Sequence, residues 1–502
     1  MSAGSRNSEF PARRRAVTWL AFSLGAGGFF LILPSRGLSF SLQYSIVLVV
    51  LTMLCLRWLT RPVHPGVMGY LSPHTIILAQ SLIYFGLGPL PRLAFPGVRI
   101  IGSFNLGADE FYLPALLLCA AGLLVFDLVY RWMSRSISLN GVLRAAEENF
   151  SSPRTRGSLP LLAFFWYFLC LGIFLYMTRR YVMVTFDFVG VEGARDNIFL
   201  QSGFWLVGTA WVMLSLLLFE PGSAVSPKLI LLLLVLLLPV MVAYQVRRQV
   251  AYCLGLTLAA YYVYPHRVFS RKALVWGTFL IFAGFIMFTS VKYATRTDPA
   301  LRRQVAEERN VFLRTWRIAS SPGFFDLKPV DTHLRQSLVV RLNGLDWAAA
   351  MMEARSRFGA SFLRGRHNLE AFALYIPRVL WPNKPPGHIE TTVNWHYELG
   401  KFDQLATILG SAYADGGPVG VLAGYGFLGL FFPLAIWLIF KREDGLIVYL
   451  GALLPLLSYE TYLMAYVALW FRWALIVMIL NSAVFFARSW FLPRKERNPG
   501  ET

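Results

Sequence analysis

The sequence predicts an all-α, polytopic integral membrane protein with about twelve transmembrane helices. Three observations support this fold class. Hydrophobic residues make up 56% of the 502 residues, which soluble globular chains rarely reach. Runs such as residues 229–242 consist almost entirely of Leu, Ile and Val. Polar and charged residues gather instead in one long segment, from about residue 291 to residue 405.

Nine apolar segments precede this polar segment and three follow it. Each is close to the length that crosses a bilayer as a helix. The expected spans are residues 16–33, 43–59, 75–90, 112–132, 159–177, 204–219, 229–244, 250–264, 274–290, 417–440, 446–457 and 461–487. The third and the eleventh carry the weakest signal. The chain therefore divides into helices 1–9 over residues 1–290, a large loop over 291–405, and helices 10–12 with a basic tail over 406–502.

Lys and Arg in the short connectors orient the helices, since such residues stay on the cytoplasmic side. The basic connectors are residues 57–61, 131–156, 266–272 and 441–442, together with the tail 488–497. They share one side if both termini are cytoplasmic, which places the long loop on the outer face. The net charge of +20 is thus attributed to topology and anionic head groups rather than to nucleic acid.

Arginine dominates the basic residues of the long loop. A guanidinium presents a planar fork of donors that matches phosphate in a bidentate manner, and a lysine ammonium does not. The loop is also predicted to be folded, because apolar side chains recur at helical spacing over residues 334–352. These features predict an outer-face site for an anionic substrate carried by the membrane.

Two sets of arginines lie where the topology rule disfavours them. Arg247 and Arg248 lie in the tight connection between the seventh and eighth spans, and Arg195 lies in the polar connection between the fifth and sixth. Phosphate binding at the membrane surface is one interpretation. The alternatives are snorkelling anchors for the pair and an ordinary ion pair with Asp196 for Arg195.

Residues 375–385 form the most distinctive local pattern. Its prolines stiffen the backbone, so that Arg378 and Lys384 are held with little entropy to lose. Trp381 offers a flat apolar face for a sugar ring. The alternative is a rigid surface turn.

Three candidates for a general base lie in the last part of the loop and directly after it. His396 has a side chain that titrates near neutral pH, Glu390 lies close to it in sequence, and Asp415 lies in the glycine-rich stretch 410–420. A surface histidine and a helix cap are the competing interpretations of His396 and Asp415. The sequence contains no Cys or His spacing typical of metal ligands, and we expect neither a metal nor a cofactor.

The segment Ile376-Pro377-Arg378, followed by Trp381-Pro382-Asn383-Lys384-Pro385, resembles the PR-x-x-WP-x-KP segment of bacterial oligosaccharide repeat-unit polymerases of the Wzy type. The glycine-rich start of the tenth helix, Tyr413 to Gly420, is similar to that family too. So is the order of about twelve helices with one large late loop. The architecture matches over the full length, and the motifs match within residues 341–429.

The resemblance implies a metal-independent glycosyltransferase of the GT-C type in the bacterial inner membrane. Such enzymes take undecaprenyl-pyrophosphate-linked oligosaccharides on the periplasmic face and join them into O-antigen, capsule or exopolysaccharide. Outer-face arginines hold the pyrophosphate, a role that Arg195, Arg247, Arg248 and Arg378 would fill here. The implied partners are the lipid-linked oligosaccharide, membrane lipids and a chain-length regulator protein.

Three other functions fit the same sequence. In a structural membrane subunit, the arginine-rich loop would dock an acidic surface of a partner protein. O-antigen ligases share the architecture. A flippase for lipid-linked oligosaccharides would have a similar number of helices, but charged residues would line a cavity between them. The few charges expected inside the spans and the polar character of the loop favour the polymerase.

Overall fold

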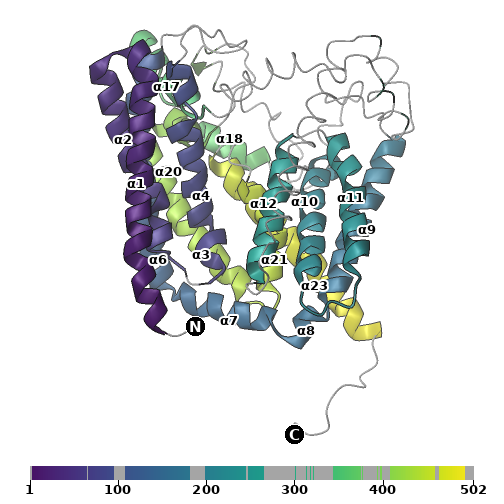
Figure 1. Ribbon diagram of the computed structural model, residues 1–502. Coiled ribbons are helices and arrows are strands. Elements are labelled where there is room, and N and C mark those ends of the chain that lie inside the picture. The colour runs from purple at the N-terminus through teal and green to yellow at the C-terminus, as the bar shows by residue number, and fades with distance from the viewer. Residues whose placement is uncertain are drawn as a thin grey trace. The chain divides into compact units, whose positions relative to one another are not determined.

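The computed structural model describes residues 3–64, 66–94, 108–180, 198–244, 247–264, 343–374, 407–457 and 463–491, with a few single residues between 300 and 399. All regular elements among these residues are helices (Figure 1). The chain divides into two compact units. The first comprises Met1–Ala145, Asp331–Lys441 and Pro455–Phe471, and the second comprises Ala146–Val330, Arg442–Leu454 and Arg472–Thr502.

The first unit begins with a helical hairpin. Helix α1 (Ala3–Arg36) and helix α2 (Leu38–Thr60) are joined at Gly37, whose φ of 77° reverses the chain. Large apolar side chains of α1 face outward, among them Trp19 and Phe30, at 72% and 70% exposure. Exposed aromatic residues at this density are expected on a surface that contacts lipid.

The third span is not a uniform α-helix. Ser72 caps helix α4 (Pro73–Ser81), its side chain accepting a hydrogen bond from the Thr75 N–H. The helix then widens into a π-helical turn, η1 (Leu82–Leu87), before the short helix α5 (Leu90–Ala94). The glycines and prolines of residues 86–91, which weaken the helical pattern in the sequence, lie in this irregular part of the span.

Helices α6 (Tyr112–Ser136) and α20 (Ile408–Phe440) pack closely in the centre of the first unit. Glycines allow the approach: a Cβ on Gly429 would lie 2.9 Å from Val129 Cβ, and a Cβ on Gly122 would lie 2.7 Å from the Tyr425 ring. Small residues serve the same purpose in membrane helix pairs generally, because they bring two backbones together.

Two shorter helices of the first unit come from the long loop. Helix α17 (Leu345–Phe358) is mostly buried, and helix α18 (Arg366–Leu374) follows after a short connection. Within this unit, they lie at the end opposite to helix α3 (Met68–Leu71) (Figure 1). The sequence predicted a loop helix over 334–352, but helix α17 starts at Leu345, and residues 331–342 lie outside the described residues.

The second unit contains helices α8 (Pro153–Arg156), α9 (Leu159–Arg180), α10 (Ile198–Phe219), α11 (Pro227–Tyr244), α12 (Arg247–Val263) and α21 (Gly445–Gly451). Its core is tied by buried polar contacts. Thr209 donates to the Gly451 carbonyl at 2.7 Å and accepts from Trp473 Nε1 at 3.0 Å. Trp166 Nε1 donates to Asn481 at 2.9 Å.

Three further helices include residues of both units or lie at a boundary: α7 (Leu139–Phe150), α22 (Leu453–Leu457) and α23 (Leu463–Phe491). Among the described residues, seven helices are long and apolar enough to cross a membrane, and α10 and α11 contain shorter apolar stretches. The protein is therefore a multi-pass helical membrane protein. The predicted ninth span, 274–290, lies outside the described residues.

Candidate functional site

Helix α20 is broken within its first turns. It begins at Ile408, where the Thr407 side chain accepts a hydrogen bond from the Gly410 N–H at 3.0 Å. At Gly417 the backbone turns to φ 62° and ψ −146°, and Pro418 follows. A Cβ on Gly417 would lie 2.3 Å from the Phe362 ring, so only glycine fits this position. The sequence predicted that the span starts at residue 417, but the helix already begins nine residues earlier, at Ile408.

The loop segment 361–368 packs against this break. Leu363 N–H donates to the Ala414 carbonyl at 3.0 Å, and Arg364 N–H donates to the Asp415 carbonyl at 2.8 Å. Tyr397 Oη donates to the same Ala414 carbonyl at 2.9 Å. Because the break removes the donors that an intact helix would provide, these carbonyls can accept bonds from the loop.

Asp415 anchors helix α18 rather than capping its own helix. Its carboxylate accepts the His367 N–H at 3.0 Å, the Asn368 N–H at 2.8 Å and the Asn368 side-chain amide at 2.6 Å. An anion at a helix N-terminus satisfies the open N–H groups and the local dipole. The side chain that we named as a candidate base thus makes a set of structural hydrogen bonds.

Asn368 extends the anchor to the start of helix α23. Its side-chain oxygen lies 3.4 Å from both Ser411 Oγ and the Met464 N–H, and Ser411 Oγ accepts from the Leu463 N–H at 2.9 Å. Three segments that are distant in sequence therefore meet at this point of the first unit.

His367 and His396 have opposite environments. His367 is fully buried next to the Trp347 ring, and burial lowers its pKa to about 3, which keeps it neutral at physiological pH. His396 is exposed, and its Nε2 lies 2.7 Å from the Ser361 carbonyl. A carbonyl can only accept, so Nε2 carries the proton and Nδ1 holds the lone pair in the neutral ring. Nδ1 is the atom that could accept a substrate proton.

Two exposed arginines lie near the break, Arg355 on helix α17 and Arg364 in the loop segment 361–368. Arg355 donates to the Ala360 carbonyl at 2.9 Å, and its guanidinium lies 3.7 Å from the centre of the Phe362 ring that fills the break. Arg364 has a positive φ of 52° and an exposed side chain with no ion-pair partner among the described residues. Positive φ is unusual outside glycine, and such strain is found preferentially at functional positions.

The structure thus relates two of the predicted catalytic residues through one segment. His396 contacts residue 361, and Asp415 contacts residues 364, 367 and 368. Arg355 and Arg364 were counted among the loop arginines but not selected. Their signal in sequence was weak, because only the fold brings them to the break in α20.

Among the remaining predicted residues, Trp381 alone has a described side chain, and it is 40% exposed. Arg247 and Arg248 are the first residues of helix α12 in the second unit, and their side chains lie outside the description. Arg195, Arg378, Lys384 and Glu390 also lie outside the described residues.

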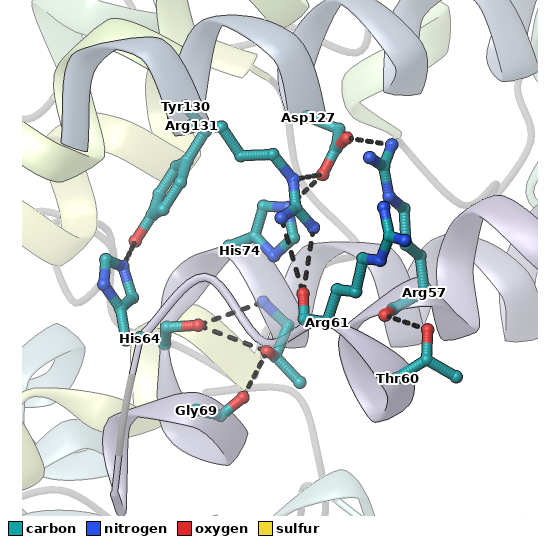
Figure 2. A network of polar contacts seen from close by, with 11 residues as sticks. Arg57, Thr60, Arg61, His64, Gly69, His74, Asp127, Tyr130 and Arg131 are labelled. Atoms are coloured by element: carbon teal, nitrogen blue, oxygen red, sulfur yellow. Dashed lines mark hydrogen bonds and ion pairs between the residues drawn. The ribbon is translucent and has the colours of Figure 1, made fainter. Parts of the chain in front are cut away.

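A second polar cluster lies inside the first unit, and the sequence analysis did not predict it (Figure 2). Asp127 of α6 is 1% exposed and accepts from His74 Nε2 at 2.7 Å, Arg131 Nε at 2.6 Å and Arg57 Nη1 at 3.2 Å. Beside it, His64 contacts Asn140 Oδ1 at 2.8 Å and the Tyr130 hydroxyl at 3.1 Å. We name Arg57, His74, Asp127 and Arg131 the Asp127 cluster.

One signal in the sequence pointed to this cluster: Asp127 is an acidic residue within an otherwise apolar span. The neighbouring arginines were attributed to topology, and the cluster was therefore not predicted. Asp127 is one of the few charges expected within the spans. Burial around His64 lowers the pKa of its imidazole to about 4, so this ring is neutral at physiological pH.

Comparisons with models of protein families, with curated proteins and with solved structures find no match to this chain.

Proposed function

We propose that the protein is an integral-membrane glycosyltransferase that joins undecaprenyl-pyrophosphate-linked oligosaccharide units into a polysaccharide. Three features support the proposal: the multi-pass helical fold, the resemblance of residues 376–385 and 413–420 to repeat-unit polymerases, and the site at the break in α20. The observation that carries it is the packing of one arginine-bearing loop segment into a broken helix beside an exposed imidazole.

The chemistry follows from the residues at this site. The hydroxyl of the acceptor sugar gives its proton to His396 Nδ1, and its oxygen forms a bond to the anomeric carbon of the donor glycan. The bond between that carbon and the pyrophosphate oxygen breaks, and the electron pair leaves with the lipid pyrophosphate. Arg355 and Arg364 stabilise the growing negative charge, a role in which guanidinium groups favour the transition state over the ground state.

Further residues are assigned from the sequence. Arg378 and Lys384 would bind the pyrophosphate, and Trp381 would stack on a sugar ring. Arg195, Arg247 and Arg248 of the second unit are proposed as phosphate-binding residues from their sequence positions alone. Glu390 stays a candidate for orienting the acceptor. We assign Asp415 a positioning role, because its carboxylate accepts three hydrogen bonds that hold helix α18.

The experiment is complementation of a strain that lacks the gene, with lipid-linked glycans resolved by length on a gel. Wild type is compared with His396→Ala and Arg364→Ala. Arg366→Ala is the matched control, since this exposed arginine pairs with Glu370 at 2.8 Å. The proposal predicts long polymer for wild type and control, and single lipid-linked units on the outer face for the two site variants. Long polymer in both site variants, with each variant present in the membrane at the wild-type level, would contradict the proposal.

The Asp127 cluster favours a second candidate, a flippase for lipid-linked oligosaccharides. Transporters use buried ionisable groups between helices for their substrates and coupling ions, and this cluster is such a group. The same strains separate the candidates when the accumulated units are also assayed for the membrane face that they occupy. Single units that accumulate on the cytoplasmic face indicate a flippase, and polymer that is made but not moved to its final acceptor indicates a ligase.

A further inference from the structure

The Asp127 cluster contains more positive charge than its carboxylate can offset. Two guanidinium groups and a histidine surround one aspartate. Arg131 is the more buried partner at 14% side-chain exposure, whereas Arg57 is 40% exposed. Pairing Arg131 with Asp127 neutralises the interior, which leaves the charge of Arg57 at the outer edge of the cluster.

The end of helix α2 is held in place from two directions. Asp127 accepts from Arg57 through Nη1 alone. Arg131 donates from Nη1 and Nη2 to the Arg61 carbonyl at 3.4 and 3.3 Å. Arg57 and Arg61 are therefore fixed by the same aspartate, one through its side chain and the other through Arg131 and the backbone (Figure 2). The held guanidinium of Arg57 binds a ligand with less loss of entropy than a mobile one would, and the held backbone of Arg61 keeps the base of its side chain in place.

Guanidinium N–H donors remain available at the C-terminal end of α2. Within the part of the chain that the structure describes, Arg57 Nε and Nη2 have no acceptor. The guanidinium of Arg61 also has no acceptor there, and its side chain is exposed. Arg57 lies in the last turn of α2, and Arg61 directly follows the helix with an extended φ of −141° and a ψ of 72°.

Aromatic residues mark this end of the first unit as a membrane interface. Trp58, next to Arg57, packs edge-on against Tyr70 with ring centres 5.6 Å apart. Trp132, next to Arg131, is 61% exposed. Trp and Tyr gather at the level of lipid head groups.

We propose that Arg57 and Arg61 form a binding site for a phosphate group at the membrane surface, preorganised by the Asp127 cluster. Each of the two guanidinium forks can bind phosphate oxygens in a bidentate manner. Simple snorkelling would also bring arginines to this level, but it requires no buried carboxylate to hold one of them. The phosphate comes either from the head group of an anionic lipid or from a small soluble phosphate. The site lies at the end of α2 and is separate from the break in α20.

The test is native mass spectrometry of the full-length protein released from micelles that contain phosphatidylglycerol or phosphatidylcholine. Wild type should retain phosphatidylglycerol in preference to phosphatidylcholine. Arg61→Gln should lower this retention about tenfold, because it removes one charge-assisted contact. Arg144→Gln is the matched control, an exposed arginine in helix α7 of the same unit. It should behave as wild type.

Arg57→Lys provides a second readout, since it keeps the charge and loses the planar fork. Its retention should lie between those of wild type and Arg61→Gln. Displacement of phosphatidylglycerol by millimolar inorganic phosphate would support a soluble phosphate as the ligand, and resistance to it would support the lipid. Equal retention by wild type and Arg61→Gln, or an equal loss in Arg144→Gln, would overturn the proposal.

Discussion

At the scale of single residues, the structure separates titratable groups that hold helices together from titratable groups that are exposed. Asp415 and His396 looked equivalent in sequence, both being titratable residues near the end of the long loop. In the structure, Asp415 accepts three hydrogen bonds from helix α18, whereas His396 is exposed and makes one bond through Nε2. Sequence could nominate these residues, but their partners are 35 to 48 positions away.

Replacement of Asp415 tests its role as an anchor. Asp415→Ala leaves three donors without their acceptor and should lower the free energy of unfolding by about 2 kcal/mol. Asp415→Asn keeps one acceptor oxygen and should lose less. The measurement is the thermal midpoint of the protein in detergent. A wild-type midpoint in Asp415→Ala, combined with a complete loss of polymer in cells, would instead indicate a catalytic carboxylate.

Two buried histidines predict how stability depends on pH. Burial lowers the pKa of His64 to about 4 and that of His367 to about 3, below the value near 6.5 of an unfolded chain. Between these values the unfolded state binds protons that the folded state does not. The free energy of unfolding should therefore fall as the pH drops from about 6.5 toward 4.

The pH effect is measured as the thermal midpoint between pH 8 and pH 4 in detergent. His64→Gln should flatten the slope, since glutamine does not titrate. A wild-type slope in the His64 variant would contradict the assignment of this ring as a buried neutral group.

At the scale of elements, hydropathy predicted the positions of the helices well. The fourth predicted span, 112–132, lies within α6, and the second, 43–59, lies within α2. Such agreement is expected, because a membrane helix must satisfy its backbone internally and show apolar side chains to lipid. Hydropathy could not predict the break in α20, because the break depends on the tertiary contact between Gly417 and the Phe362 ring.

The break can be tested at two adjacent glycines. Gly417→Ala places a Cβ at positive φ and against the Phe362 ring, which should cost about 1–3 kcal/mol and shorten or abolish polymer. Gly416→Ala is the control, because its φ is not positive and a Cβ there meets no atom within 4 Å. Thermal midpoints and glycan gels measure the two effects. Equal behaviour of both variants would show that the break is not needed.

The packing of α6 on α20 gives a parallel test. A Cβ on Gly429 would lie 2.9 Å from Val129 Cβ and 3.1 Å from the Phe126 carbonyl, so that Gly429→Ala should push the two helices apart and lower the thermal midpoint. Gly426→Ala serves as the comparison, since its Cβ would meet Val125 at an ordinary 3.5 Å. An unchanged thermal midpoint in Gly429→Ala would show that α6 and α20 can separate enough to admit the methyl group without a loss of stability.

At the scale of the whole molecule, the sequence established a polytopic helical membrane protein, and the described helices agree with it. The count of twelve spans and the GT-C class stay predictions. The Asp127 cluster shows what whole-chain reasoning lacked: its side chains come from α2, α4 and α6, and only tertiary packing brings them together. Arg57 and Arg131, which the sequence explained by topology alone, both pair with the buried Asp127.

The proposed orientation can be measured by labelling single cysteines in intact cells. Positive-inside reasoning places the loop segment 361–368 outside and the connector 131–156 inside. Arg364→Cys should react with a membrane-impermeant maleimide added to intact cells, and Arg144→Cys should react only after the membrane is opened. The four native cysteines are buried, which keeps the background low. The reverse pattern of labelling would contradict the assignment of the substrate site to the outer face.

The central claim is that this chain alone transfers a glycan from one lipid pyrophosphate to another lipid-linked unit. The most direct measurement uses purified protein in liposomes, supplied with the lipid-linked unit that accumulates in the deletion strain, without nucleotide sugar or added metal. The account predicts a ladder of longer lipid-linked glycans and released undecaprenyl pyrophosphate, with no ladder from His396→Ala. Unextended units after incubation with folded wild-type protein would contradict it.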